Sequence, residues 1–134
     1  MPVAFDLDPQ ARLVRSRAWG VVDAAELMGH VVSMRSLFAG GTLDADWAQV
    51  ADFSDCTSLE SVSSAGVRRL AENNPWPVGA VRVFIAPQEL IFGLTRMYQS
   101  LADLDRLHVV RSMADARAWM AEQGHPIDTP EQPR

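Results

Sequence analysis

The chain has 134 residues, of which 48% are hydrophobic and 22% charged, and its formal net charge is -5. This length allows one domain with a substantial core, and the composition is that of an ordinary globular protein. Seventeen acidic against twelve basic residues make nucleic acid a poor partner, because phosphate contacts supply most of that affinity. All twelve basic residues are Arg. The absence of Lys excludes Schiff-base chemistry, a P-loop lysine and a lysine general base.

Cysteine usage and the first residues bear on the compartment. Cys56 is the only cysteine, which excludes an internal disulfide and a thiolate metal cluster. The start, MPVAFDLD, lacks the basic and then apolar pattern of a signal peptide. No run approaches the ~18 apolar residues of a membrane span. We therefore expect a cytoplasmic protein without a transmembrane segment.

The first third of the chain has the pattern of a β-hairpin followed by a helix. Residues 3–7 and 11–20 are the expected strands, joined by the turn sequence DPQA. In the second strand small side chains alternate with long ones, so one face can lie under a helix. Apolar spacings of four and three then predict a helix that begins after Asp23 and ends at residues 39–41, AGG.

The rest of the chain alternates between expected strands and helices. The strands are expected at residues 48–53, 80–86 and 106–112, and the helices at residues 64–72, 89–104 and 113–123. The longest helix has an apolar stripe that we expect to face inward: Leu90, Leu94, Met97, Leu101 and Leu104. After Gly124 no periodicity remains, so we expect a domain at residues 1–123 and a flexible tail at 124–134.

The order of these elements, ββαβαβαβα, predicts a single α/β domain. Strands that alternate with helices form right-handed crossovers onto a largely parallel sheet. The opening hairpin adds an antiparallel pair, so the sheet is expected to be mixed, mostly parallel and packed by helices. The mostly apolar segment 48–53 is typical of a central parallel strand.

Three segments resemble the STAS domain, the fold of bacterial anti-sigma-factor antagonists (SpoIIAA-like proteins). They are WAQVADFSDCTSLESVSSAG, VRVFIAPQELIFGLTRMYQSLAD and VVRSMADARAWM, and the resemblance spans residues 3–122. The second and third look especially similar to small bacterial proteins grouped as SpoIIAA-like or STAS/SEC14-like. The resemblance implies the SpoIIAA-like/STAS fold and, for function, a signalling protein that binds other proteins.

The resemblance also suggests where a phosphate switch would lie. In the antagonists a strand ends in an acidic residue and leads to Asp-Ser-Ser-Gly at a helix start, where a partner kinase phosphorylates the second serine. Here Asp52 matches the strand-end acid, and Ser64 matches the first serine. Ser63 stands at the aspartate position, and Ala65 stands at the acceptor position before Gly66. Since alanine cannot accept a phosphoryl group, Ser64 is left as the candidate phosphorylation site.

The same serines have a simpler interpretation as helix caps. A hydroxyl at a helix start satisfies a free backbone N–H and stabilises the helix by roughly 1 kcal/mol. A phosphate there would be favoured by the helix N-terminus and by Arg68 or Arg69, and opposed by Asp52 and Asp55 if these lie close by. Capping alone is the preferred interpretation, with a regulated serine or other binding at this loop as alternatives.

Further candidate contact residues lie on the longest expected helix and on a proline-flanked loop. Phe92 and Arg96 share a second face of that helix, and a large aromatic beside an Arg is a common interface anchor. The alternative is that Phe92 packs under the last helix or a loop. Trp76, between two prolines, either plugs the core or is an exposed contact residue.

Metal, cofactor and catalytic sites are not supported by the sequence. His30, His108 and His125 fall on a helix, a strand and the tail, without the close spacing of a helical metal site. A hydrolase nucleophile is usually flanked by two glycines, and VSSAGV lacks the first. Cys56 lies among carboxylates, which raise a thiol pKa. We expect no cofactor and no metal.

Three function hypotheses of different class follow. The first is a non-enzymatic signalling or interaction module that binds a protein partner, or forms a homodimer, through residues 54–66 and 89–104. The second is a module that binds a small apolar ligand or a lipid or membrane surface, with Met, Trp and Phe lining a pocket. The third, an enzyme, needs a cleft in which Ser63 or Ser64 meets a histidine.

Overall fold

A computed structural model describes residues 2–59, 61–102 and 106–127, and their elements follow the predicted order ββαβαβαβα. The strands are β1 (Val3–Asp8), β2 (Leu13–Val21), β3 (Ala48–Ser58), β4 (Arg82–Ile85) and β5 (Leu107–Val110). The helices are α1 (Ala24–Ala39), α2 (Ser64–Glu72), α3 (Glu89–Ala102) and α4 (Met113–Glu122). The expected single α/β architecture is confirmed.

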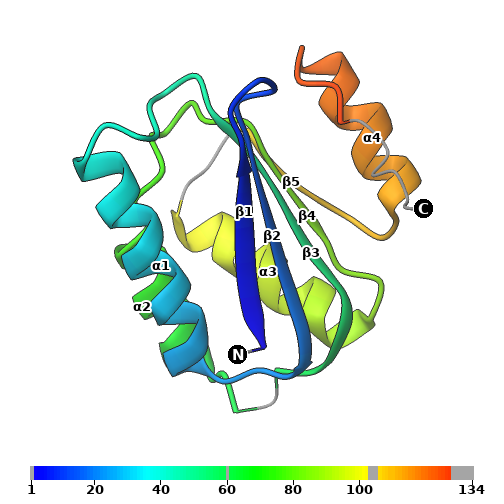
Figure 1. Cartoon of the computed structure of the whole chain (residues 1–134). Coiled ribbons are helices and arrows are strands. Elements are labelled where there is room, and N and C mark those ends of the chain that lie inside the picture. Colours follow the sequence, from blue (N-terminus) through cyan, green and yellow to red (C-terminus); the bar gives the residue numbers. More distant parts are fainter. Residues whose placement is uncertain (1, 60, 103–105, 128–134) are drawn as a thin grey trace.

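The strands form one mixed sheet in the order β1-β2-β3-β4-β5. β1 runs antiparallel to β2, and β2 to β5 are parallel, as the sequence predicted. Because each parallel strand returns through a helix, the carboxyl ends of β2, β3, β4 and β5 share one edge of the sheet. This edge is at the bottom of Figure 1, where α1 and α2 begin.

The helices are divided unequally between the two faces of the sheet. α1, α2 and α3 pack on one face, and α4 alone packs on the other (Figure 1). The register assigns alternate rows of side chains to the two faces. On the three-helix face, for example, Gln49 of β3 lies beside Arg82 of β4. On the α4 face, Val50 lies beside Val83.

The alternation predicted for β2 is confirmed. Its small residues are buried and face the three helices: Val14, Ser16 and Ala18. On the opposite face Arg15 is half-buried and makes an ion pair with Asp8 of β1, 3.5 Å apart. Arg17 is exposed and lies over the ring of Trp19, 4.5 Å from its centroid. This β1–β2 half of the α4 face is therefore charged and partly open.

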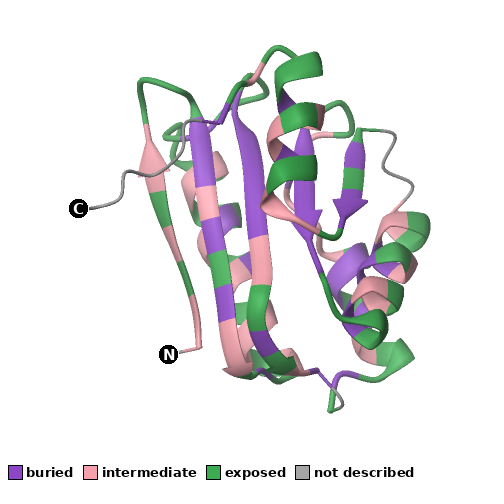
Figure 2. Ribbon diagram, turned by 90° about the vertical axis from the view of Figure 1, so that its right-hand side faces the viewer, coloured by how far each residue is buried: buried purple, intermediate pink, exposed green. Residues whose placement is uncertain are grey.

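β3 is longer than the strand predicted at residues 48–53. β4 accompanies β3 only as far as the pair Asp52–Ile85, whereas β2 pairs with β3 as far as Ser58. Residues 54–58 therefore form a two-stranded ribbon with β2, not a loop. Burial falls along β3 where β4 stops, as Figure 2 shows. The polar residues Ser54, Asp55 and Thr57 look like turn chemistry, yet they are compatible with a ribbon that has solvent on its faces.

The inward stripe predicted for the longest helix is wrong. The buried residues of α3 are Ile91, Thr95 and Tyr98. Leu90 is 59% exposed and Leu101 is 37% exposed, while Leu94 and Met97 are half-buried at the edge of the core. The helix is rotated because Tyr98 reaches a polar partner in the core, which no apolar periodicity reveals. Leu104, the last member of the predicted stripe, lies outside the described residues.

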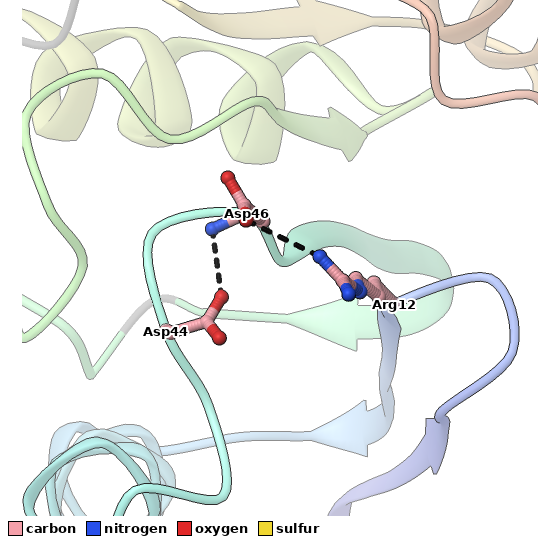
Figure 3. Close-up of polar contacts among 3 residues, drawn as sticks. All are labelled: Arg12, Asp44 and Asp46. Atoms are coloured by element: carbon pink, nitrogen blue, oxygen red, sulfur yellow. Dashed lines mark hydrogen bonds and ion pairs between the residues drawn. The ribbon is translucent and has the colours of Figure 1, made fainter.

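One surface ion pair joins the hairpin turn to the loop before β3, at the edge of the sheet opposite the starts of α1 and α2, and a second polar contact lies within that loop. Arg12 Nη1 lies 3.2 Å from Asp46 Oδ2, and the Asp46 N–H donates to Asp44 Oδ1 at 2.9 Å (Figure 3). Both charged side chains are largely exposed, so the ion pair contributes little. The backbone bond from Ala48 N–H to Arg12 O, 2.9 Å, fixes where β3 begins.

The end of the chain packs further than its sequence indicates. α4 begins after Ser112, as predicted, and ends at Glu122. Ile127 is buried in the core of the α4 face, five residues beyond the helix. Residues 128–134 of the expected tail lie outside the described residues, and the domain boundary after residue 123 stays a prediction. Within the described ranges no helix is long and apolar enough to cross a membrane.

Candidate functional site

The start of α2 is capped by Ser63, as the sequence predicted. Its Oγ accepts a hydrogen bond from the backbone N–H of Gly66 at 3.1 Å. Ser63, Ser64 and Ala65 are all exposed at the carboxyl edge of the sheet. Ser63 is engaged in the cap, whereas the Ser64 side chain is exposed and makes no hydrogen bond to any residue that the structure describes, so its phosphorylation stays a prediction.

Gly66 is not required by a close approach of backbones. A Cβ at this position would lie 3.6 Å from Ser63 Oγ and from Val62 Cγ1, and 3.7 Å from Ala24 Cβ. These are ordinary contact distances, and φ at Gly66 is not in the left-handed region. Gly66 contributes to the helix start through its backbone N–H, which donates to Ser63 Oγ.

Asp52 and Asp55 are both on β3, but they have different surroundings. The half-buried Asp52 accepts a hydrogen bond from the Ser54 N–H through Oδ1 at 2.8 Å, and its register with Ile85 places it on the α4 face. The exposed Asp55 lies 3.9 Å from Arg17 Nη2. Among the described residues, neither carboxylate has a hydrogen bond or ion pair with the serines of α2. The repulsion of a phosphate that the sequence suggested therefore stays a prediction.

The β3 ribbon is tied to the start of α3. Gln88 Nε2 donates to the backbone oxygen of Cys56 at 2.8 Å. Burial raises the pKa of the Cys56 thiol, and a hydrogen bond with the Ser58 backbone lowers that pKa by a smaller amount. The expected direction of this shift is correct, but burial causes it, not neighbouring carboxylates. A thiol held in this form is a weak nucleophile.

Phe92 and Arg96 lie together on α3, with a third residue that the sequence did not connect to them. Arg111, after β5, places its guanidinium 4.0 Å from the centroid of Phe92, and Arg96 lies at 5.9 Å. Arg111 also makes an ion pair with Glu89, 3.0 Å apart. Phe92 is half-buried, so it packs beneath an arginine and is not a free anchor.

Trp76 is not a contact residue at the surface. It is 4% exposed and packs edge-on against Phe38, with ring centroids 5.0 Å apart. It precedes β4, at the end of the sheet opposite the starts of α1 and α2. The interpretation as a core plug is correct, because the two flanking prolines turn the ring beneath α1.

A polar chain that the sequence did not predict crosses the three-helix face of the sheet. Arg82 Nε donates to Gln49 Oε1 at 2.9 Å, and Gln49 Nε2 donates to Ser16 Oγ at 3.0 Å. Ser16 Oγ lies 2.8 Å from His30 Nε2. Ser16 Oγ accepts from the Gln49 amide and makes a second hydrogen bond with His30 Nε2, in which the donor depends on the tautomer of the His30 ring. The chain joins β4, β3, β2 and α1.

The environment of His30 agrees with a neutral ring. Burial, and then the positive charge of Arg82, lower the pKa of His30 from 6.5 to about 4. The ring also packs edge-on against Phe5, with centroids 5.6 Å apart. His108, in contrast, stacks on Trp119 of α4, at 5.0 Å. The structure gives neither histidine a contact with Ser63 or Ser64, so the arrangement that an enzyme needs is not present in the described residues.

Arg82 is the centre of this chain and is only 4% exposed. Its Nη1 donates to Asn74 Oδ1 at 3.1 Å and to the Tyr98 hydroxyl at 3.3 Å. The rings of Trp76, Phe84 and Tyr98 lie between 5.2 and 5.7 Å from the guanidinium carbon. Four ion pairs occur among the described residues, and none of them includes Arg82. A buried cation without a carboxylate is rare, because its desolvation is costly.

A cavity of about 110 Å³ adjoins the polar chain, between the sheet and the three helices. Its floor is made of small strand residues, among them Ser16, Ala18 and Ala51, and its roof of apolar side chains from α1, α2 and α3. Arg82, Gln49 and His30 line its polar part. Within the described ranges no group of three or more His, Cys, Asp and Glu side chains is placed to hold a metal ion.

A signal for this site is present in the sequence but is easily overlooked. AVRVFIA and AQVADF are buried strands, and each carries one long polar residue in an apolar run, Arg82 and Gln49. Since fully buried Arg and Gln are uncommon, such interruptions mark a place where polar groups must meet inside the fold. Nothing local shows that the two residues are neighbours.

Comparison with known proteins gives a fold and no closer relative. No protein-family model matches the chain, and no curated protein sequence matches it. The solved structure of the anti-sigma factor antagonist SpoIIAA in its unphosphorylated form is similar, with a TM-score of 0.53 and 12% sequence identity. The match covers 92% of this chain and 100% of that one. The chain therefore has the SpoIIAA-like (STAS) fold that its sequence motifs indicated.

Proposed function

We propose that this protein is a non-enzymatic signalling or interaction module that binds a protein partner, or a second copy of itself, through residues 54–66 and the helix α3. The SpoIIAA structure that is similar in fold is described as an antagonist of an anti-sigma factor, so it acts on another protein. This support is an analogy of fold, which by itself does not carry function. A feature of the surface must therefore carry the proposal.

The exposed apolar stripe of α3 is the observation that carries it. Leu90 is 59% exposed and Leu101 is 37% exposed, Leu94 and Met97 are half-buried between them, and Arg96 is exposed alongside. These leucines and the methionine recur at helical spacing, so they form one continuous strip. α3 packs against α2, whose exposed start lies at the carboxyl edge of the sheet. An apolar strip bordered by Arg and Ser is the composition of a protein interface.

Regulation at this surface is proposed to differ from that of the antagonists. Ala65 is exposed as the second residue of α2, at the position that the resemblance assigns to the phosphoacceptor. We propose that residue 65 does not regulate the interaction, because alanine cannot accept a phosphoryl group. We also propose that Ser64 is the only serine of this motif with a hydroxyl free for modification. Intact-mass measurement of the protein isolated from its own cells, followed by peptide mapping, tests whether Ser64 carries phosphate.

Charge insertion into the stripe tests the proposed surface. The double variant Leu90→Glu/Leu101→Glu should abolish self-association in analytical ultracentrifugation, or remove partners in quantitative affinity capture from the protein's own cells. Val78→Glu is the matched control, because Val78 is 69% exposed in the loop before β4 and away from α3. Both variants should retain the fold, since the substituted side chains are on the surface.

Two results would overturn the proposal. One is a monomeric wild-type protein that captures nothing above background. The other is association or capture that the double variant and Val78→Glu change to the same extent, because the effect would then come from charge alone and not from α3.

A second candidate function, binding of a small apolar ligand, is favoured by the cavity. Its 110 Å³ is somewhat below the about 150 Å³ of an engineered cavity that holds benzene. A space of this size suits a molecule of roughly one ring and not the acyl chain of a membrane lipid. Of the two versions of this hypothesis, a small ligand is therefore favoured over a lipid.

A further inference from the structure

Arg82 brings an uncompensated positive charge to the wall of a cavity that is otherwise mostly apolar. We propose that this cavity is a binding site for a small organic monocarboxylate, aliphatic or aromatic, whose carboxylate pairs with Arg82. The hydrocarbon part of the ligand lies between the strand residues Ala18 and Ala51 and the helical residues above them. This site is separate from the α3 surface proposed for protein binding, and neither depends on the other.

The charge of Arg82 is the first argument. Its Nε and Nη1 donate only to uncharged acceptors, on Gln49, Asn74 and Tyr98. Its Nη2 makes no hydrogen bond to any residue that the structure describes. A guanidinium offers donors in a fixed fork that fits a carboxylate, and such pairs are strongest where water is excluded. The partner that a buried Arg normally has is therefore not supplied by the described part of the chain.

The direction of the hydrogen bonds is the second argument. From Arg82 the hydrogen bonds run along the chain, from Nε to Gln49 and from the Gln49 amide to Ser16, whose Oγ shares a hydrogen bond with His30 Nε2. Tyr98 in turn donates to Asn74 Oδ1 at 3.3 Å. These side chains therefore use their donors on one another, and the free donor that remains at the cavity is on Arg82. The free Nη2 group suits a singly charged carboxylate, whereas a phosphate dianion needs more donors than this wall offers.

The shape and lining of the cavity are the third argument. Phe84, Leu70 and Leu94 contribute apolar side chains, so a ligand must be largely hydrocarbon outside its charged group. Among the residues that the structure describes, no acidic side chain opposes an anion from within, because Asp52, which also borders the cavity, belongs to the row of the sheet that faces α4. An apolar body with one anionic end therefore matches both parts of the wall.

An opening for such a ligand lies between β1 and α1. A surface groove there is lined by Phe5, Gly29 and Ser33, and it shares Val3 and His30 with the cavity. Asp23 and Glu26 also line the groove, and each of their carboxylates accepts a hydrogen bond from the backbone N–H of the other residue in the capping box of α1. Val3 is only half-buried, and Gly29 is exposed on α1 without a side chain to close the groove. Movement of the Val3 side chain would connect the groove to the cavity.

A purely structural role of Arg82 is the competing explanation. The three surrounding rings stabilise its charge by cation–π interaction, and its hydrogen bonds tie α3 to the sheet. Such an arginine would need no ligand. The two explanations differ in whether the cavity distinguishes an anion from a neutral molecule of the same shape.

Titration of the full chain with benzoate and with benzyl alcohol, followed by amide chemical shifts in two-dimensional NMR, makes this distinction. We expect benzoate to shift the amides around the cavity, those of residues 16–18, 49–51 and 82–84, and to bind at least about tenfold more tightly than benzyl alcohol. Butyrate should give the same pattern of shifts. Equal binding of benzoate and benzyl alcohol, or no shift at these amides, would overturn the proposal.

Two variants complete the test. Arg82→Met should remove the preference for benzoate over benzyl alcohol, because it keeps the volume and removes the charge. Ala51→Leu keeps Arg82 but fills the cavity, so it should lose both ligands. If Arg82→Met does not fold, Ala51→Leu and the comparison of the two ligands still decide. Retention of benzoate binding in Ala51→Leu would place the ligand elsewhere and contradict the assignment.

Discussion

The two faces of the sheet solve the same packing problem in different ways. On the α4 face the buried strand residues are aliphatic, such as Val50, Val83 and Ile85, and they pack without polar interruption against Ala116 and Met120. The three-helix face has more helical cover, yet it contains a cavity and a buried polar chain centred on Arg82. The single helix α4 thus packs tightly on the strands beneath it, whereas α1, α2 and α3 leave a cavity. The difference suggests that the α4 face provides stability and the three-helix face accommodates a site.

Truncation of one buried side chain on each face should give the largest difference in stability loss between the two faces. Ile85→Ala, at a fully buried position on the α4 face, should lower the free energy of unfolding by about 4 kcal/mol. Leu70→Ala, in the wall of the existing cavity, should cost only about 2 kcal/mol, because its side chain has fewer contacts to lose. Urea unfolding measures both. A larger loss for Leu70→Ala would show that the three-helix face is the tighter one.

Acid should weaken the three-helix face through His30. The unfolded chain binds a proton at this residue near pH 6.5, whereas the folded chain does so only near pH 4. The stabilising contribution is therefore present above pH 6.5 and is lost as pH falls from there to about 4, with a total loss of about 3 kcal/mol.

Unfolding free energies measured across this pH window check the prediction. His30→Gln removes the titrating ring but leaves a polar partner for Ser16, so its stability should no longer fall by this amount. His108→Gln, on the α4 face, is the matched control and should keep the His30 effect. If the stability of His30→Gln still falls by the same amount across this pH window, another titrating group causes the loss.

Two alanines of β3 compare the faces by adding volume. Ala48 is fully buried on the α4 face, and Ala48→Val should destabilise the protein by about 1–3 kcal/mol through overpacking. Ala51 borders the cavity, and Ala51→Val should stabilise by about 1 kcal/mol, because the added methyl groups fill existing space. Thermal unfolding of the pair gives the sign of each effect. Destabilisation by both would mean that the cavity cannot accept a larger side chain.

Loss of a helix cap is expected to lower the stability least, and the loss should be similar on the two faces of the sheet. Ser63 caps α2 and Ser112 caps α4, and the Oγ of each accepts a hydrogen bond of 3.1 Å from a backbone N–H. Replacement of either by Ala should cost about 1 kcal/mol, and Ser64→Ala should cost close to nothing. Urea unfolding of the three variants measures this. A large loss for Ser64→Ala would show that Ser64, and not Ser63, supports the helix.

Local signals in the sequence predicted most of the fold. The order of strands and helices, the caps at Asp23, Ser63 and Ser112 and the alternation in β2 were all found as expected. These features depend on neighbouring residues only, since capping acts over three positions and burial patterns repeat every two or four. The candidate residues at the start of α2 were placed correctly for the same reason.

Long-range packing decided the features that the sequence left open or predicted wrongly. The length of β3 depends on where β4 stops, and the rotation of α3 depends on the hydrogen bond of Tyr98 to Arg82. Trp76 is buried because Phe38, from a distant helix, covers it. In each case the deciding partner is far away in the chain.

The sequence by itself determined a SpoIIAA-like α/β domain with a serine-capped helix at the carboxyl edge of its sheet. Only the tertiary structure decided that Ser16, His30, Gln49 and Arg82 meet in one polar chain beside a cavity. The physical reason is that burial of a charge depends on the side chains around it, and these come from separate strands and helices.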